Sequence, residues 1–292
     1  MNRKCLYIGV ALWSLFFSSI SLAWVKGIYV SQPTLESSGK LRYLIDESKS
    51  VGINTFVVDV NRKSRAFERN IQLLKQNGIN FVARIVVFPN GGSVAQVEDD
   101  SFWQRRMGMI DYAIDNGAKK IQLDYIRYHT RVKPAARNAH DISEVIDWFR
   151  DQVHKRSAKL EVAVFGETSY KPSLSIGQNV KVFAPNIDSL APMLYPSHWE
   201  PYTFHSKNPY KTVFDSLEAL DQQFGGEAPF PVIAYIETSN YRYRIEGQER
   251  LDYIHAQLKA VEDAEIDGWY AWSASNYYQG LFRVLHHYTQ LR

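Results

Sequence analysis

The stretch IQLDYIRY, residues 121–128, places a carboxylate inside an otherwise apolar strand pattern. Ile121 and Leu123 alternate with Gln122 and Asp124, so the two pairs occupy opposite faces of a strand. An ionised carboxylate among apolar neighbours is costly unless something pairs with it or uses it. We therefore expect Gln122 and Asp124 to face the interior of a closed sheet, with Asp124 near its upper rim. Ile121 and Leu123 would then pack outward against helices.

Eight strand-like runs follow one another along the chain, and nearly all of them are apolar on both faces. Continuous apolar strands are typical of a parallel sheet that helices cover. The runs are 25–31, 55–61, 81–88, 120–127, 160–167, 189–196, 230–237 and 268–275.

Helical patterns separate these runs. Leu251, Ile254, Leu258 and Val261 form one apolar stripe of such a helix. A glycine, typical of the position just past a helix end, precedes several of the strands. These glycines are Gly52, Gly78, Gly117 and Gly268. Repeated βα units predict a single (β/α)8 TIM barrel over residues 24–292, with an open doubly wound sheet as the alternative.

The first 23 residues differ in kind from the rest. Arg3 and Lys4 precede an apolar run over residues 5–22, and Ala23 offers a small residue for cleavage. This pattern predicts a secretory signal peptide, residues 1–23, that is cut after Ala23. The alternative is an uncut membrane anchor. With cleavage, we expect a periplasmic or secreted protein that lacks the only cysteine and is not stably inserted in a membrane.

The balance of charges is close to neutral. The chain has 34 Lys and Arg against 31 Asp and Glu, and only Arg3 and Lys4 leave with the leader. No basic patch indicates a nucleic-acid partner. The sequence has no H-E-x-x-H, G-x-S-x-G, Walker or G-x-G-x-x-G motif, and we predict neither a cofactor nor a metal. The sequence does not indicate an oligomeric state.

Four acids end predicted strands: Asp59, Asp124, Glu167 and Glu237. The carboxyl ends of parallel strands meet at one mouth of a barrel, and like charges there raise one another's pKa. Such pairs can supply one protonated and one ionised carboxyl at the same pH. For Asp59 a structural role is the alternative, in which it accepts from loop amides or pairs with nearby basic residues, Arg62 or Lys63.

Asp124 and Glu167 end neighbouring strands. Adjacent strands lie about 4.8 Å apart, so two carboxyls at their tips can approach the roughly 5–5.5 Å spacing of retaining glycosidases. Glu237, across the barrel, remains a competing partner for Asp124. A divalent metal on Asp59, Asp124 and Glu167 is a further alternative.

The other residues of the predicted rim suit a sugar. Aromatic faces together with hydrogen-bonding side chains match a ring that has apolar faces and equatorial hydroxyls. We expect one of Trp269 and Trp272 to pack the barrel instead. The predicted substrate-binding residues are Asp59, Tyr125, Arg127, Tyr195, His198, Trp199, Glu237, Trp272 and Asn276.

Four segments together resemble a known family. KGIYVS, KIQLDYIRY, APMLYPSHW and GWYAWSASNYY are similar to motifs of the putative glycosyl hydrolase domain family of bacterial (β/α)8 barrels, which is distantly similar to the alpha-amylase clan. The resemblance implies a glycosidase with a carbohydrate substrate. In that clan the nucleophile is an Asp at the end of strand four and the acid/base a Glu at the end of strand five. By position these are Asp124 and Glu167.

These observations lead to one hypothesis and two alternatives. We expect an exported glycoside hydrolase that cleaves a polysaccharide, with Asp124 as nucleophile and Glu167 as general acid/base. Asp59 and Glu237 would orient hydroxyls or tune the pair. The alternatives are a non-catalytic sugar-binding barrel and a metal-dependent hydrolase or deacetylase.

Overall fold

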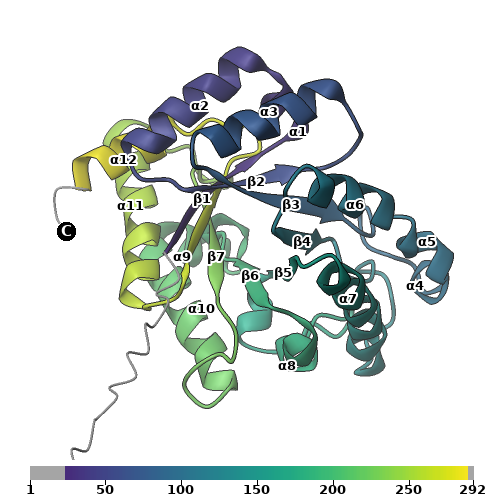
Figure 1. Cartoon of the computed structure of the whole chain (residues 1–292). Helices are drawn as coiled ribbons and strands as arrows, with labels where there is room; N and C mark the ends of the chain where they lie inside the picture. Colours follow the sequence, from purple (N-terminus) through teal and green to yellow (C-terminus); the bar gives the residue numbers. More distant parts are fainter. Residues whose placement is uncertain (1–23, 289–292) are drawn as a thin grey trace, which may run out of the picture.

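The computed structural model describes residues 24–288, and its centre is a closed barrel of parallel strands in the order β1 to β8 (Figure 1). The predicted (β/α)8 barrel is confirmed, and the open sheet is wrong because β1 pairs with β8. The strands are β1 Val25–Val30, β2 Thr55–Asp59, β3 Asn80–Val86, β4 Lys120–Asp124, β5 Lys159–Phe165, β6 Ser189–Met193, β7 Ile233–Glu237 and β8 Gly268–Trp272.

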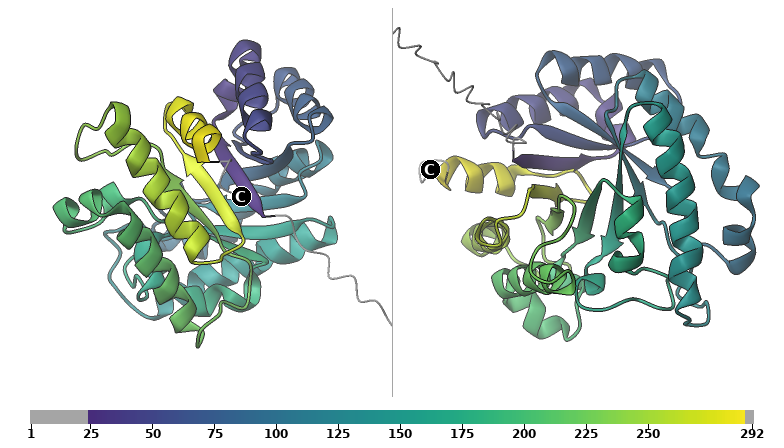
Figure 2. Two further views of the ribbon diagram at one scale, coloured as in Figure 1. Left: turned by 90° about the vertical axis from the view of Figure 1, so that its left-hand side faces the viewer. Right: turned by 60° about the horizontal axis from the view of Figure 1, so that its bottom comes forward.

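Helices surround the strands on all sides, as Figure 2 shows from two further directions. The C-terminal helix lies next to α2 and so closes the ring between the two ends of the barrel. The helices are α1 Gln32–Glu36, α2 Ser38–Ser50, α3 Arg65–Gln76, α4 Val94–Glu98, α5 Asp100–Gln104, α6 Met107–Asp115, α7 Arg137–Lys155, α8 Val180–Phe183, α9 Tyr202–Lys207, α10 Pro209–Gln223, α11 Gly247–Asp263 and α12 Gln279–Tyr288.

The predicted signal peptide, residues 1–23, lies outside the described residues. Within residues 24–288, no helix combines the length and apolar character that a membrane crossing requires.

Strand β4 has the two faces that its alternation predicts. Ile121 and Leu123 are fully buried in the core between strands and helices. Gln122 points inward, where its amide donates to Glu161 and its carbonyl accepts from the Tyr235 hydroxyl, both at 2.8 Å. The barrel is therefore filled by side chains, and its inner polar groups are hydrogen-bonded.

The lower part of the interior contains a sealed polar network around Glu161, which is fully buried. Its carboxylate accepts from Lys120, Gln122 and Ser189, each at 2.8 Å. A buried carboxylate is tolerated when a cation and further donors satisfy it in this way. The network supports the barrel below the mouth where Asp124 lies.

Three of the four predicted helix-ending glycines occupy the left-handed region, with φ of 75° for Gly52, 72° for Gly78 and 100° for Gly117. For Gly268 the prediction is wrong, because this residue begins β8. A side chain there would approach the Val25 carbonyl oxygen to 2.1 Å. After α11 the left-handed residue is Glu265, with φ 53°.

Candidate active site

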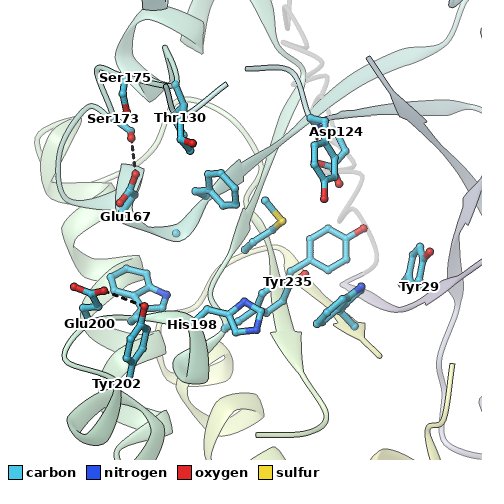
Figure 3. A pocket seen from close by; sticks show the side chains of 18 of the residues that line it. Tyr29, Asp124, Thr130, Glu167, Ser173, Ser175, His198, Glu200, Tyr202 and Tyr235 are labelled. Atoms are coloured by element: carbon cyan, nitrogen blue, oxygen red, sulfur yellow. Dashed lines mark hydrogen bonds between the residues drawn. The ribbon is translucent and has the colours of Figure 1, made fainter. Parts of the chain in front are cut away.

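A cavity of about 750 Å³ opens at the carboxyl ends of the strands. Side chains from β1, β3, β4, β5, β6, β7 and β8 reach it, together with loops that follow the strands (Figure 3). This is the end of the barrel where strand-to-helix loops build sites. Seven predicted site residues line it: Asp124, Tyr125, Glu167, Tyr195, His198, Trp199 and Trp272.

Asp124 ends β4 at the inner part of the cavity and is held on both oxygens. Arg84, from the neighbouring strand β3, donates to Oδ2 through Nε at 2.8 Å and through Nη2 at 2.6 Å. The Tyr125 amide donates to Oδ1 at 2.5 Å. A guanidinium and a backbone N–H both favour the ionised form of a carboxyl group. Asp124 therefore presents an oriented carboxylate to the cavity.

The backbone turns sharply directly after this carboxylate. Tyr125 has φ 51°, a left-handed conformation that costs a non-glycine residue about 1–2 kcal/mol. The turn aims the Tyr125 amide at Asp124. Residues with such backbone conformations cluster at functional sites, where the surrounding structure holds them in place.

Arg84 is itself buttressed by a second carboxylate. Its Nη1 donates to Asp59 at 2.5 Å, and the Tyr29 hydroxyl donates to the other Asp59 oxygen at 2.6 Å. Burial, followed by the charge of Asp59, raises the pKa of Tyr29, so this hydroxyl keeps its proton. We call the set of Tyr29, Asp59, Arg84 and Asp124 the Arg84 network.

The predicted partners of Asp59 are wrong. Arg62 pairs with Glu36, and the Lys63 amine lies over the Tyr112 ring. Asp59 does not line the cavity but contributes to it through Arg84. The alternative of a metal ion on Asp59, Asp124 and Glu167 is not supported, because the carboxylates of Asp59 and Asp124 both bind the Arg84 guanidinium. Among residues 24–288 there is no group of three or more His, Cys, Asp and Glu side chains suited to a metal ion.

Glu167 enters the cavity from the other side. It belongs to a short 3-10 helix, Gly166–Ser169, directly after β5, and its Oε1 accepts from Ser173. Figure 3 shows Asp124 on the right of the cavity and Glu167 on the left. Only glycine fits at position 166, directly before Glu167, because a Cβ on Gly166 would approach Trp199 Cζ2 to 2.4 Å. The Glu167 side chain is exposed and lines the cavity.

Glu237 ends β7 but does not line the cavity. Its carboxyl group is fully buried and accepts from the Ser197 amide at 2.7 Å, the Ser197 hydroxyl at 2.8 Å and the Tyr253 hydroxyl at 2.6 Å. Burial raises its pKa to about 7, although these donors act in the opposite direction. The structure thus places this predicted sugar-binding residue behind the cavity, where it anchors the loop after β6.

The loop after β6 places His198 at the cavity. Its Nε2 lies 4.0 Å from the Glu237 carboxylate. Burial, with a smaller effect from Arg242, lowers the pKa of His198, so the ring is neutral at pH 7. The ring packs edge-on against Tyr195 with centroids 5.4 Å apart. His198 can therefore act as a neutral hydrogen-bonding group.

An aromatic wall stands on the β6 and β8 side of the cavity. Tyr195 and Trp272 stack with centroids 5.0 Å apart, and Tyr241 lies 5.4 Å from Trp272. The expectation that one tryptophan of β8 packs the barrel is met by Trp269, which is buried in the outer core. Tyr195 is buried, whereas Trp272 is half-buried, so the Trp272 ring is the one suited to stacking on a sugar.

Two further predicted residues lie beside the cavity. Arg127 lines a separate pocket of about 50 Å³, donates to the Tyr128 carbonyl and stacks between the rings of Tyr125 and Phe165. Asn276 does not line either pocket. Its carbonyl accepts from the Ser31 amide and hydroxyl, and its NH2 group donates to the carbonyls of Tyr29 and Ser273, so it ties the β8 loop to β1.

A family model described as "Putative glycosyl hydrolase domain" matches residues 90–278, which is more than half of the chain. The chain belongs to this glycosyl hydrolase family. The match covers β4 to β8, and so it includes Asp124, Glu167, the loop after β6 and Trp272. The predicted family is thereby confirmed, and the glycosidase prediction is confirmed with it.

Solved structures of several glycosidases share the fold of this family member. An endo-1,4-beta-mannanase from Rhizomucor miehei aligns with a TM-score of 0.68 at 13% identity, over 92% of this chain and 95% of that chain. A chitinase from Chromobacterium violaceum aligns with a TM-score of 0.63 at 13% identity, over 92% and 100%. A Bacillus megaterium spore cortex-lytic enzyme aligns with a TM-score of 0.61 at 10% identity, over 90% and 73%. No curated protein matches the sequence.

Several residues of this glycosyl hydrolase domain reach the cavity without having been predicted. Arg84 could have been found, because a guanidinium inside the apolar run 81–88 is the same signal that Asp124 gives. The loop residues carry no such signal, since their positions depend on how distant segments fold over the mouth. The residues missed include Tyr29, Arg84, Thr130, Phe165, Ser173, Ser175, Met193 and Glu200.

Proposed function

We propose that the protein is an exported glycoside hydrolase that cleaves a polysaccharide with two carboxylates, Asp124 as nucleophile and Glu167 as general acid/base. One observation carries this proposal. Asp124 presents an oriented carboxylate, bonded to Arg84 and to a backbone amide, at the inner part of a cavity walled by aromatic rings. In that arrangement the Asp124 carboxylate can act as a nucleophile, and the aromatic rings can bind a sugar.

The two carboxyl groups have complementary environments. Arg84 binds the Asp124 carboxylate and orients it for an attack on the anomeric carbon. Glu167 is exposed, and its carboxyl group accepts a hydrogen bond from the neutral Ser173 hydroxyl. It would protonate the leaving oxygen while Asp124 forms a covalent bond to the sugar. It would then take a proton from the water that releases the sugar.

The surroundings support a carbohydrate chain as the substrate. Tyr195, Trp199 and Trp272 contribute aromatic rings to the lining of the cavity, and neutral His198 offers a nitrogen to a hydroxyl. An enzyme that degrades a polysaccharide outside the cell has to be exported. The leader pattern of residues 1–23 supports that location.

The first test uses the nucleophile. Purified protein is screened against bacterial exopolysaccharides, and Asp124→Asn is then assayed on the substrate found. We expect turnover to fall by about 10⁴-fold or more, and azide to restore part of it by forming a glycosyl azide of inverted configuration. Turnover close to that of the wild type would reject Asp124 as nucleophile.

The second test uses the acid. In Glu167→Gln, cleavage of the natural linkage should fall by about 10²–10⁴-fold, because the leaving oxygen no longer receives a proton. Formation of the covalent intermediate from an aryl glycoside with a good leaving group should be much less affected. Equal losses on both substrates would move the acid role away from Glu167. Binding without turnover by the wild-type protein on every glycan would support the non-catalytic sugar-binding barrel instead.

A further inference from the structure

A small side pocket of about 50 Å³ adjoins the main cavity at the end of β4. Arg127 and Gln178 line this pocket but not the cavity, whereas four residues line both: Asp124, Tyr125, Phe165 and Met193. Roughly 10–15 Å³ is enough for one water molecule, so the pocket has room for a substituent of a few heavy atoms but not for a sugar ring. Because Asp124 borders the pocket, that substituent would belong to a sugar bound beside the proposed nucleophile.

Arg127 brings a buried positive charge to the side pocket. The residue is 9% exposed, and its guanidinium lies 5.2 Å from the centre of the Tyr125 ring and 5.1 Å from that of the Phe165 ring. Burial lowers the pKa of Arg127, but a guanidinium keeps its proton at neutral pH. Among the described residues no carboxylate forms a salt bridge with Arg127, since Asp124 is bound by Arg84 instead.

Most of the hydrogen-bonding capacity of the Arg127 side chain is unused. Nη1 donates to the Tyr128 carbonyl at 2.9 Å, and this is the one side-chain hydrogen bond of Arg127 within the described part of the chain. Nε and Nη2 have no acceptor there, and they are not sealed in the interior. In a guanidinium these two nitrogens form one edge, with two parallel N–H groups that match the two oxygens of a carboxylate.

Gln178 adds a second donor to the side pocket. The residue is 2% exposed, and its Oε1 accepts from the Phe165 amide at 2.9 Å. Because only the oxygen of the side-chain amide can accept from that N–H, the bond fixes the orientation of the group and leaves Nε2 on the other side. Among the residues that the structure describes, Nε2 has no acceptor, and it too is not sealed in the interior. Two largely buried side chains thus present unused donors to one small pocket.

A structural role accounts for only part of this arrangement. The bond to Tyr128 holds the loop after β4, and stacking on two aromatic rings offsets part of the cost of burying a cation. A buried charge without a counter-ion nevertheless remains unfavourable. Neither role uses the Nε and Nη2 edge of Arg127 or the Nε2 of Gln178. Since all of these atoms are donors, the partner that suits them is an acceptor with a negative charge.

We infer that the side pocket binds the carboxylate of a uronic acid, so that the substrate is an acidic polysaccharide. The Nε and Nη2 edge of Arg127 would donate to the two carboxylate oxygens, and Gln178 would supply a further N–H. Arg84 offsets the charge of Asp124, which leaves the charge of Arg127 for the substrate. This inference rests on the proposed glycosidase function and specifies its substrate.

Charge and shape separate the possible substituents. A uronate forms charge-assisted hydrogen bonds with Arg127, which are roughly twice as strong as neutral ones. A hydroxymethyl or amide group at the same carbon is neutral and forms weaker bonds. An ammonium group there meets a like charge and is repelled. A sulfate ester is also an anion, but its tetrahedral oxygens match the planar edge of a guanidinium less well than a carboxylate does.

Binding to the wild-type protein tests the inference without turnover. The probes are methyl glycosides of glucuronic acid, its uronamide, glucose 6-sulfate and 6-amino-6-deoxyglucose, with the galacto and manno series measured in parallel by protein NMR titration. We expect the uronate to bind at least about tenfold more tightly than the uronamide, which has the same shape, and the amino sugar to bind most weakly. Equal affinities for uronate and uronamide in all three series, or a tighter sulfate, would overturn the inference.

Gln178→Glu places a negative charge in the side pocket with a minimal change of shape. The introduced carboxylate can still accept from the Phe165 amide, but it replaces the Nε2 donor. The ratio of affinities for uronate and uronamide should fall by about tenfold or more, because like charges repel. The matched control is Gln72→Glu, which makes the same exchange at an exposed position of α3 and should keep the ratio. An unchanged ratio in Gln178→Glu would reject the pocket.

Arg127→Gln tests the cation itself. With folding verified by circular dichroism, this variant should bind uronate and uronamide about equally, and a persistent tenfold preference would overturn the role of Arg127. Should the variant not fold, Gln178→Glu still decides. Because these assays need no catalysis, a negative result leaves the Asp124 proposal standing, whereas an active Asp124→Asn would reject that proposal alone.

Discussion

The ends of β4 and β7 both carry an acid, and the two acids lie in different surroundings. Asp124 lines the cavity and is ion-paired with Arg84. Glu237 is fully buried, accepts from Ser197 and Tyr253, and has a pKa raised to about 7 by its burial. The comparison shows that a position at the mouth of a barrel does not by itself make an acid catalytic. A cationic partner and an opening to the cavity distinguish the two.

Apart from the two proposed catalytic acids, the largest effect is expected at Arg84. Arg84→Gln removes the cation that stabilises the ionised Asp124, so kcat/KM should fall by about 10²–10³-fold. Steady-state kinetics on the cleaved polysaccharide measure this loss. Arg84→Lys, which keeps the charge, should restore part of the activity, and an unchanged kcat/KM in Arg84→Gln would contradict this role.

A smaller effect is expected at Glu237, and it concerns stability. The folded pKa of about 7 lies above the ordinary value of 4.5, so above pH 4.5 the folded state binds more protons than the unfolded state. The free energy of unfolding should therefore be highest near pH 5 and fall by about 3 kcal/mol as the pH rises to 8. Denaturant unfolding at several pH values measures this.

The control for that measurement is Glu237→Gln, which cannot ionise and keeps the size of the side chain. Its free energy of unfolding should lose the decline between pH 5 and 8 that Glu237 contributes. A decline equal to that of the wild type would assign the pH dependence to other groups.

The smallest effect is expected from the Tyr253 hydroxyl, which donates to Glu237 Oε1 at 2.6 Å. Tyr253→Phe should lower the free energy of unfolding by about 1.5–3 kcal/mol at pH 8, where the acceptor is charged. At pH 5 the acceptor is neutral, and the loss should be nearer 1 kcal/mol. Thermal and denaturant unfolding at the two pH values compare these losses. A loss independent of pH would show that the hydroxyl does not respond to the charge of Glu237.

The fold was predictable because its signals are local. Each strand is a short apolar run, and the alternation of Gln122 and Asp124 with Ile121 and Leu123 already fixes the two faces of β4. Asp124 could be singled out for the same reason, since a carboxylate in such a run needs a partner.

The partners were harder to predict, because they come from distant segments. Pairing with Arg62 or Lys63 was the structural alternative for Asp59, but Arg84 on the adjacent strand takes that place. Glu237 was expected at the cavity, but Tyr253 of α11 and Ser197 of the loop after β6 enclose it. Strand-end position is visible in a sequence, whereas the helix or loop that covers a strand end depends on tertiary packing.

The most direct test of the account compares the two strand-end acids in one assay. On the polysaccharide that the wild-type protein cleaves, kcat is measured for Asp124→Asn and Glu237→Gln at the same pH, with unfolding curves to confirm that both variants are folded. We predict a loss of about 10⁴-fold or more for Asp124→Asn and of less than about tenfold for Glu237→Gln. The reverse order, with Glu237→Gln inactive and Asp124→Asn active, would contradict the assignment of the chemistry to the end of β4.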